Sequence, residues 1–181
     1  MSAQRQALIQ AGGRLAAHVT LGELTPERLC AESGLAPTAF SANFTSLTEY
    51  LVTLQQDFMD RLRAKIVAVT TGVPAGIRRT ELAAETYLGA CLSERALRAW
   101  LIEARAQPDV LAGLRQQNHI YWILIGIEFE ALGWPHPRAA ARLYLTMLNE
   151  ASVIENRLGK RSNAVRLTVR NFLRNGNSVA S

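Results

Sequence analysis

The stretch "LTPERLCAESGLAPTAFSANF", residues 24–44, decides the fold. Thr25 can cap a helix, and Pro26 suits the first helical position because its missing N–H would be unpaired there anyway. Gly34 can adopt the left-handed conformation that ends a helix. The first half of the stretch therefore predicts a short, well-delimited helix followed by a tight turn.

A second short helix is predicted directly after that turn. Leu35, Pro37 and Phe40 repeat the spacing of apolar residue, proline and apolar partner that opens the first helix. Two short helices joined by a glycine turn, with a longer helix ahead of them, is the arrangement that lays the second helix into the major groove of DNA.

Helical spacing of apolar residues continues along the whole chain, and no segment alternates as a strand would. An amphipathic helix precedes the stretch, and a capping box of Ser46 and Glu49 opens a helix at about 46–69. Further helices are expected at about 76–92, 94–106, 109–133, 137–159 and 162–174, each bounded by a proline, glycine or capping serine. The fold class is predicted to be all-α.

Composition excludes several classes of protein. The 181 residues carry a net charge of +5, and no apolar run approaches the ~20 residues of a membrane span. No signal peptide precedes the first helix, so we expect a cytoplasmic protein without membrane contact. Cys30 and Cys91 have no metal-ligand spacing, and the motifs HExxH, GxSxG and the phosphate loop are absent. We expect no metal, no cofactor and no enzymatic activity.

Residues 5–51 resemble the N-terminal domain of TetR-type transcriptional regulators. The resemblance rests on scaffold positions: Thr25, Leu29, Cys30, Gly34, Leu35, Phe40, Phe44, Ser46 and Leu51. It implies a three-helix DNA-binding domain with a helix-turn-helix at 1–50, and a helical bundle at 51–181 that binds ligand and dimerises, the helix at 46–69 connecting the two. It further implies a homodimeric repressor that binds a double-stranded DNA operator and is released by a small-molecule effector.

The predicted DNA contacts are unusually poor in charge. They are Thr25, Arg28, Pro37, Thr38, Ser41, Ala42, Asn43 and Ser46. Positions 37 and 41–43, where this family commonly carries lysine, tyrosine and histidine, are neutral here. Arg5 and Arg14 add charge only if they face the DNA backbone. The alternative is a helical dimeric regulator or adaptor that keeps the fold with weak or no DNA binding.

Residues of the second half are candidates for an effector pocket because they combine large apolar surfaces with polar tips. They are Trp100, Glu103, His119, Tyr121, Trp122, Glu128, Phe129, Tyr144 and Met147. Burial in an ordinary helical core is the alternative for each aromatic residue. Glu128 is expected to point inward, either toward an effector or toward an arginine such as Arg105 or Arg142.

The last two predicted helices are candidates for the dimer interface, since small residues on the first of them permit close approach of another helix. The residues are Ala141, Leu145, Leu148, Ser152, Val165, Val169 and Phe172. Arg166, Arg170 and Arg174, four apart, form one basic stripe. We expect this stripe to be solvated, or to meet an acidic partner or nucleic acid.

Overall fold

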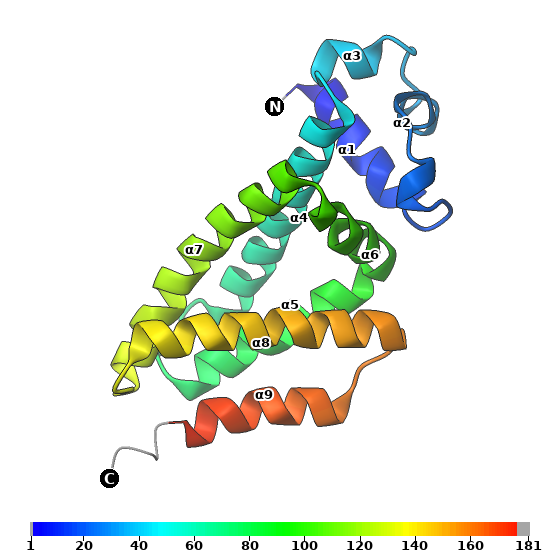
Figure 1. Cartoon of the computed structure of the whole chain (residues 1–181). Coiled ribbons are helices and arrows are strands. Elements are labelled where there is room, and N and C mark those ends of the chain that lie inside the picture. Colours follow the sequence, from blue (N-terminus) through cyan, green and yellow to red (C-terminus); the bar gives the residue numbers. More distant parts are fainter. Residues whose placement is uncertain (1, 177–181) are drawn as a thin grey trace. The chain divides into compact units, whose positions relative to one another are not determined.

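The computed structural model describes residues 2–176, the side chain of Gln117 excepted, and over this range the chain is helical and contains no strand. The helices (Figure 1) are α1 (Ala3–Leu15), η1 (Leu21–Glu23), α2 (Pro26–Ser33), α3 (Ala39–Asn43), α4 (Leu47–Thr70), α5 (Ile77–Ser93), α6 (Arg95–Glu103), η2 (Ala104–Ala106), α7 (Pro108–Ala131), α8 (Pro137–Leu158) and α9 (Asn163–Asn175). The all-α prediction is confirmed. None of the described helices has both the length and the hydropathy needed to cross a bilayer.

The helix ends lie where capping residues and glycines predict them. The Thr25 hydroxyl accepts the N–H of Arg28 at 3.3 Å, and Gly34 closes α2 with φ +70°. Gly159 ends α8 with φ +66°, and the Ser162 hydroxyl caps the first turn of α9. Local hydrogen bonding and backbone freedom therefore explain these boundaries.

The chain divides into two compact units, each built from two segments. Unit 1 comprises Met1–Asp60 and Ala96–Leu114, and unit 2 comprises Arg61–Arg95 and Arg115–Ser181. The boundary passes through α4 and α7, so both helices contribute to both units. α6 belongs almost entirely to unit 1.

The core of unit 1 is an aromatic cluster beneath the three N-terminal helices. Phe40, Phe44 and Tyr50 are buried, with ring centroids 5.1 Å apart for Phe44 and Tyr50 and 5.4 Å apart for Phe40 and Phe44. Leu8 and Leu29 are fully buried on α1 and α2. These contacts hold α1, α2 and α3 together as one body.

Gly12 on α1 makes room for Tyr50. The Tyr50 hydroxyl donates to the backbone carbonyl of Leu8 at 3.1 Å, and a Cβ atom on Gly12 would overlap the hydroxyl oxygen. Burial raises the pKa of Tyr50 well above its usual value. A helix interior normally disfavours glycine. Gly12 is explained by the close approach of the Tyr50 hydroxyl to the backbone of α1.

The second segment of unit 1 is hydrogen-bonded to the first. The Trp100 indole N–H on α6 donates to the backbone carbonyl of Val19 at 3.0 Å. The Thr48 hydroxyl at the start of α4 donates to the side-chain carbonyl of Gln107 at 3.1 Å. Residues 96–114 are therefore part of the structure that supports the helix-turn-helix.

Unit 2 is organised around α5, which packs against α8 and α9. Four rings from α7, α8, α9 and the α7–α8 turn form its aromatic core: Phe129 stacks on Trp134 with centroids 4.6 Å apart, and Tyr144 stacks on Phe172 at 6.0 Å. Phe129 and Tyr144 are essentially inaccessible to solvent.

Candidate nucleic-acid interface

The helix pair α2–α3 buries one face and exposes the other. Leu29 and Cys30 of α2 and Ala39 and Phe40 of α3 are buried in unit 1. The Leu35 N–H donates to the carbonyl of Cys30 at 3.0 Å, which closes the turn between the helices. The pair is thus fixed from its apolar side.

The outward face of α3 and of the turn before it consists of short side chains. Pro37, Thr38, Ser41 and Ala42 are all exposed. The Ser41 hydroxyl donates to the carbonyl of Thr38 at 3.1 Å and keeps its acceptor capacity toward solvent. The four predicted contacts therefore lie together on one accessible surface.

Asn43, the last residue of α3, is less available than the others. Its amide N–H donates to the carbonyl of Ala39 at 2.9 Å, and its side-chain oxygen accepts the Ser2 hydroxyl at 2.8 Å. The side chain is half-buried. Its amide accordingly ties the N-terminus of α1 to the end of α3.

Thr25 and Ser46 are engaged as helix caps. The Thr25 hydroxyl accepts the N–H of Arg28, and the Ser46 hydroxyl accepts the N–H of Glu49 at 3.1 Å. Both can still donate a hydrogen bond through the hydroxyl proton. They flank the exposed α3 surface in sequence, at the starts of α2 and α4.

Two of the three arginines near this surface are occupied inside the unit. Arg14 pairs with Glu32 at 2.6 Å and also donates to the Glu32 carbonyl. Arg5 lies over the Phe44 ring, 4.1 Å from its centroid, and pairs with Glu49 at 2.9 Å. Both therefore hold helices together, a role that the sequence alone does not reveal.

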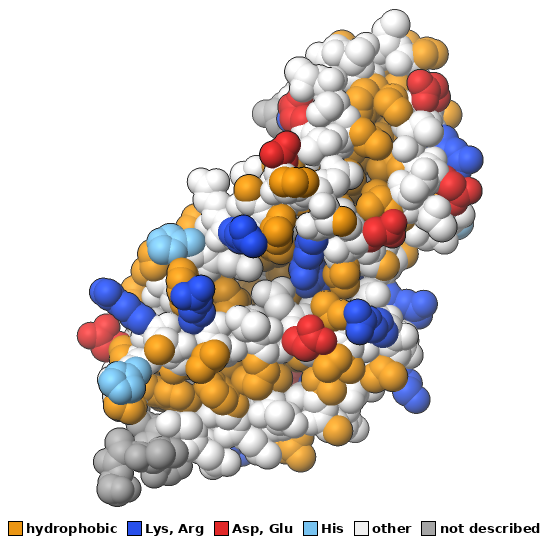
Figure 2. Space-filling view, viewed as in Figure 1, with side chains coloured by type: hydrophobic (Ala, Val, Ile, Leu, Met, Phe, Trp, Pro, Cys, Tyr) orange, Lys and Arg blue, Asp and Glu red, His pale blue; other side chains and the backbone are white. Residues whose placement is uncertain are grey.

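Arg28 differs from Arg5 and Arg14 because its side chain is available to a binding partner. It is exposed, and within the described residues it makes no ion pair. On the face of the molecule shown in Figure 2, basic side chains are sparse over α2 and α3. The electrostatic attraction of this surface for phosphate is consequently small.

Glu49 is the most strongly perturbed carboxyl of unit 1. Hydrogen bonds from the Thr45 N–H, from Arg5 and from the Thr45 hydroxyl lower its pKa to about 2. One half of the expected capping box is present, since the Ser46 hydroxyl accepts the Glu49 N–H. The Glu49 carboxylate, however, accepts the N–H of Thr45, one residue before Ser46. Stability from these bonds is complete above the ordinary glutamate pKa and is lost as the pH falls toward 2.

We expect Glu49→Gln to lower the urea midpoint of the chain at pH 7 and to flatten the decline of that midpoint between pH 5 and pH 2.5. The amide cannot accept charge-assisted bonds from Arg5 and Thr45, and it does not titrate. Urea unfolding followed by circular dichroism at several pH values measures both effects. Glu150→Gln, at an exposed position of α8, is the control, and an identical pH profile for the two variants would contradict the assignment.

The predicted pocket residues divide between the units. Trp100 and Glu103 lie on α6, with Trp100 buried and Glu103 exposed. The remaining seven lie in unit 2: His119 is exposed, Phe129 and Tyr144 are buried, and Tyr121, Trp122, Glu128 and Met147 are intermediate. The structure thus brings the α7 and α8 members into one unit.

Two buried donors in unit 2 lack a hydrogen-bond partner among the described residues. They are the indole Nε1 of Trp122 and the hydroxyl of Tyr144. The Trp122 ring also contacts Arg142, whose guanidinium carbon lies 4.8 Å from the ring centroid, and His119, edge-on at 5.2 Å. Buried donors are normally hydrogen-bonded, so both groups are available to donate a hydrogen bond to an oxygen atom of a bound molecule.

Glu128 pairs with Arg79 of α5, which donates through both Nε and a terminal nitrogen. The expectation that Glu128 has an arginine partner is confirmed, but Arg79 replaces the suggested Arg105 and Arg142. Arg79 also donates to the carbonyl of Val73 at 3.3 Å. This ion pair joins α5 and α7 within unit 2.

Most of the predicted dimer residues are buried within one chain. Ala141, Leu148, Ser152 and Val169 are each at most 5% exposed, and Leu145, Val165 and Phe172 are intermediate. They pack where α8 meets α5 and α9. Leu145, Val165 and Phe172 keep part of their surface accessible, so an interface on α8 and α9 stays a prediction.

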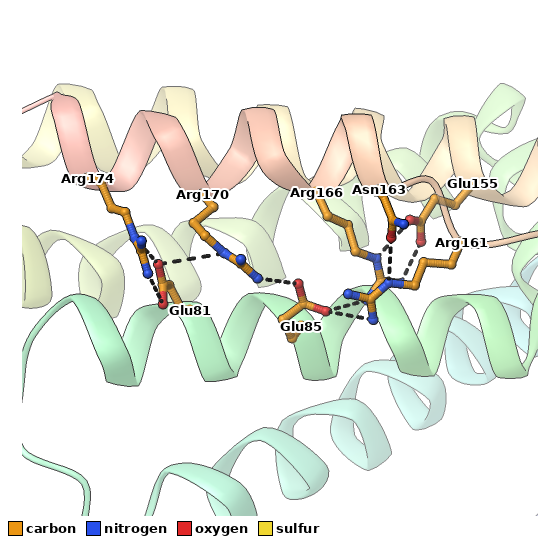
Figure 3. Close-up of polar contacts among 8 residues, drawn as sticks. All are labelled: Glu81, Glu85, Glu155, Arg161, Asn163, Arg166, Arg170 and Arg174. Carbon is orange, nitrogen blue, oxygen red and sulfur yellow. Dashed lines mark hydrogen bonds and ion pairs between the residues drawn. The ribbon is translucent and has the colours of Figure 1, made fainter.

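The basic stripe of α9 faces glutamates of α5 (Figure 3), and although Arg174 and Arg170 remain partly in solvent as expected, Arg166 is buried. Arg174 and Arg170 approach Glu81 at 2.7 and 3.8 Å, and Arg170 and Arg166 approach Glu85 at 3.4 and 2.6 Å. The arginines and the glutamates are each spaced by four residues, so they meet turn by turn. The hollow beside them has room for about one water molecule.

The ion pairs of Arg166, Arg170 and Arg174 with Glu81 and Glu85 form a ladder between α9 and α5. Its Arg166 end is buried. Arg166 donates to both oxygens of Glu155 at 2.8 and 2.7 Å, and the side chains are 5% and 1% exposed. The Ser162 N–H donates to the same carboxylate at 2.8 Å. Burial by itself raises the pKa of Glu155, but the bonds from Arg166 and Ser162 outweigh it and lower the pKa below its usual value.

Known structures share this arrangement of helices. A transcriptional regulator from Rhodococcus sp. RHA1 matches with a TM-score of 0.82 and 17% identity, over 98% of this chain and 99% of that one. A Streptomyces coelicolor A3(2) protein matches with a TM-score of 0.77 and 13% identity, over 98% and 100%. No family model and no curated protein matches the sequence.

One of the similar structures is a TetR regulator. This protein, also from Rhodococcus sp. RHA1, matches with a TM-score of 0.60 and 17% identity, over 98% of this chain and 96% of that one. The helix-turn-helix in unit 1 and the following helices agree with the resemblance of residues 5–51. Over nearly its full length, the chain has the fold of TetR-type transcriptional regulators.

Proposed function

We propose that the protein is a homodimeric, DNA-binding transcriptional regulator that acts in the cytoplasm and places α3 in the major groove. The observation that carries the proposal is the geometry of α2–α3, which is anchored on one side and exposes Pro37, Thr38, Ser41 and Ala42 on the other. The fold shared with transcriptional regulators supports it. The proposed division of labour is DNA binding by residues 1–50, and ligand binding and dimerisation by residues 51–181.

The chemistry of the α3 surface suits recognition by close fit. Thr38 and Ser41 can donate to or accept from base edges, and the Ala42 methyl can contact the methyl group of thymine. Thr25, Arg28 and Ser46 are placed to position the backbone of the duplex, with Asn43 holding α3 against α1. Specificity is thus expected to depend more on shape than on charge.

Binding to DNA from beside the protein's own gene tests this proposal, measured by electrophoretic mobility. Ser41→Glu should abolish the shift because it sets a carboxylate against phosphates and bases. Thr168→Glu is the matched control: Thr168 is likewise exposed on a helix and donates its hydroxyl to a carbonyl one turn back. Failure of the unaltered protein to shift any such fragment, also at low salt, would favour the adaptor alternative.

We expect the affinity for DNA to depend weakly on salt. With Arg5 and Arg14 occupied, one exposed arginine per subunit, Arg28, is left on α1–α3. A dimer then neutralises about two phosphates, which predicts a slope of log affinity against log salt of about −2. Arg28→Ala should bring the slope close to zero and Arg157→Ala, on α8, should leave it unchanged, whereas a slope near −5 or steeper would contradict this placement.

We further propose that a small molecule bound in unit 2 releases the DNA. The unpartnered donors of Trp122 and Tyr144 support a ligand that offers oxygen acceptors to an aromatic surface. Such a ligand acts only if it prefers a conformation whose two α3 helices are wrongly spaced for successive turns of the groove. Compounds that raise the melting temperature should therefore be tested for loss of the DNA shift, and Tyr144→Phe should weaken that response while preserving DNA binding.

A further inference from the structure

α3 is too short to hold its own orientation. It has five residues, and the side chain of Thr38 before it makes no capping hydrogen bond. Helices of this length are not stable by themselves, so contacts with the rest of unit 1 decide where α3 points. Ala39 and Phe40 bury its beginning, while Ser41 and Ala42 are exposed. The contacts at its C-terminal end therefore decide how the exposed surface is presented.

The first turn of α1 holds that end, and the two helices lie side by side (Figure 1). The Arg5 guanidinium donates to the backbone carbonyl of Asn43, the last residue of α3. It also lies 4.1 Å from the centroid of the Phe44 ring. The Ser2 hydroxyl donates to the side-chain oxygen of Asn43 at 2.8 Å. Both the backbone and the side chain at the end of α3 are thus bonded to α1 and its cap.

Arg5 is itself held by α4. One of its terminal nitrogens donates to the Glu49 carboxylate at 2.9 Å and to the Thr53 hydroxyl at 3.1 Å. The other oxygen of Glu49 accepts the N–H of Thr45, between α3 and α4, at 2.8 Å. A guanidinium carries five donors in a fixed plane and can serve several partners at once, whereas a lysine ammonium is a point charge on a flexible stem. Arg5 therefore joins α1, the end of α3 and the beginning of α4 at one point.

We propose that Arg5 is a positioning residue for DNA binding, which fixes the end of α3, and with it the direction of Ser41 and Ala42, without touching the DNA. This inference rests on the DNA binding of the proposed function. The Arg5 side chain is 26% exposed and its guanidinium is bonded within unit 1, so it is not left to neutralise a phosphate. Ser41 and Ala42 directly precede Asn43, so a shift at Asn43 moves the surface that faces the groove.

Arg14 makes the same kinds of bond at another place on α1. It pairs with Glu32 at 2.6 Å and donates to the Glu32 carbonyl at 3.0 Å, and both acceptors belong to α2. The bonds of Arg14 join α1 to α2, whereas those of Arg5 join α1 to α3 and α4. Stabilisation of unit 1 in general is common to the two arginines. The pair Arg14–Glu32 is therefore the matched control.

The sign of the effect of Glu49→Gln on DNA binding tests the positioning role. Electrophoretic mobility of the full chain with a DNA fragment from beside its own gene gives the affinity, and circular dichroism checks that each variant is folded at the assay temperature. Loss of a carboxylate from unit 1 favours binding to phosphates by charge alone. Because an uncharged amide holds Arg5 less firmly, we expect Glu49→Gln instead to weaken binding at least about 10-fold.

Glu32→Gln removes the same charge beside Arg14 and should bind the fragment at least as tightly as the unaltered protein. Equal effects of Glu49→Gln and Glu32→Gln, in either direction, would overturn the positioning role. Tighter binding by both variants would show that charge alone decides, and equal weakening would show a general loss of stability.

Arg5→Lys separates positioning from a direct phosphate contact, because lysine keeps the charge. We expect the affinity for the fragment to fall at least about 10-fold, with an unchanged slope of log affinity against log salt. Affinity for a scrambled fragment of the same composition should change far less, since non-specific binding depends on charge. Arg14→Lys should keep the affinity within about twofold. Retained affinity in Arg5→Lys, or a shallower salt slope, would contradict the proposal.

Hydrogen exchange tests the attachment of α3 without DNA. The N–H groups of Ala42 and Phe44 donate to the carbonyls of Thr38 and Phe40 at 3.1 and 2.8 Å. Arg5→Lys should speed their exchange at least about 10-fold relative to Arg14→Lys. Equal protection in the two variants overturns the inference whether or not the protein binds DNA. Faster exchange in a chain whose unaltered form shifts no fragment supports the attachment of α3 by Arg5 and overturns the proposed function alone.

Discussion

Arg166→Met should lower the free energy of unfolding by about 3–5 kcal/mol, because it leaves the buried Glu155 carboxylate without its counter-ion. Arg166 supplies two of the three hydrogen bonds that the structure gives this carboxylate, the third coming from the Ser162 N–H. Arg166 also pairs with Glu85 of α5. Its loss therefore removes ion pairs from α9 to both α5 and α8. Urea unfolding of the full chain, followed by circular dichroism, measures the change.

Two further variants separate the buried charge from general loss of contacts. Replacing both partners, Arg166→Met with Glu155→Leu, should recover most of the loss, since an apolar pair needs no counter-ion. Arg174→Met removes the exposed end of the ladder, where Arg174 is 54% accessible, and should lower the free energy of unfolding far less than Arg166→Met does, because solvent screens this pair. Similar losses of unfolding free energy for Arg166→Met and Arg174→Met would show that burial does not determine how much each ion pair contributes to stability.

Gly12→Ala should lower the free energy of unfolding by about 2 kcal/mol, the scale of an overpacked core site. Alanine in a helix interior ordinarily gains up to about 1 kcal/mol over glycine. At this position the new methyl group meets the Tyr50 hydroxyl, which is fully buried and held by the Leu8 carbonyl. Either the tyrosine or α1 must move.

Gly13 provides the control for this effect. It is the next residue of α1, and a Cβ atom there meets nothing within 4 Å, so Gly13→Ala should be neutral or stabilising. Tyr50→Phe alone should cost about 1 kcal/mol for the lost hydrogen bond. Combined with Gly12→Ala it should restore most stability, and equal behaviour of Gly12→Ala and Gly13→Ala would refute the steric explanation.

The helix boundaries were predictable because each depends on neighbouring residues. Thr25 and Pro26 begin α2, and Gly34 and Gly159 take the left-handed conformation that ends α2 and α8. Such signals act within one turn of helix and need no knowledge of the rest of the chain. The all-α class followed from them together with the apolar spacing.

The side-chain partners were not predictable because they lie far apart in sequence. The α9 arginines meet glutamates of α5 that precede them by more than 80 residues. Helical periodicity states which residues share a face, but it does not state which two faces meet. For the same reason the arginines suggested as partners of Glu128 were wrong, and the sequence did not show that Arg5 pairs with Glu49.

Residues of the candidate site were predictable to different degrees. The outward position of Pro37, Thr38, Ser41 and Ala42 followed from the burial of Phe40, since a short helix has one inner face. The apolar run around residues 120–127 of α7 is visible in the sequence, but the sequence does not show that Ile120, Ile123 and Ile127 are exposed. Only the packing of the whole unit separates its covered face from its open one.

The composition of unit 1 from two chain segments limits how this protein can be recombined with others. A chimera that transfers residues 1–50 alone leaves behind Trp100 and Gln107, which bond Val19 and Thr48. The transplanted helices would then present an unpaired Val19 carbonyl and the uncovered apolar surface beneath α6. A segment that carries the proposed DNA-binding helices into another regulator as a stable unit must therefore include residues 96–114.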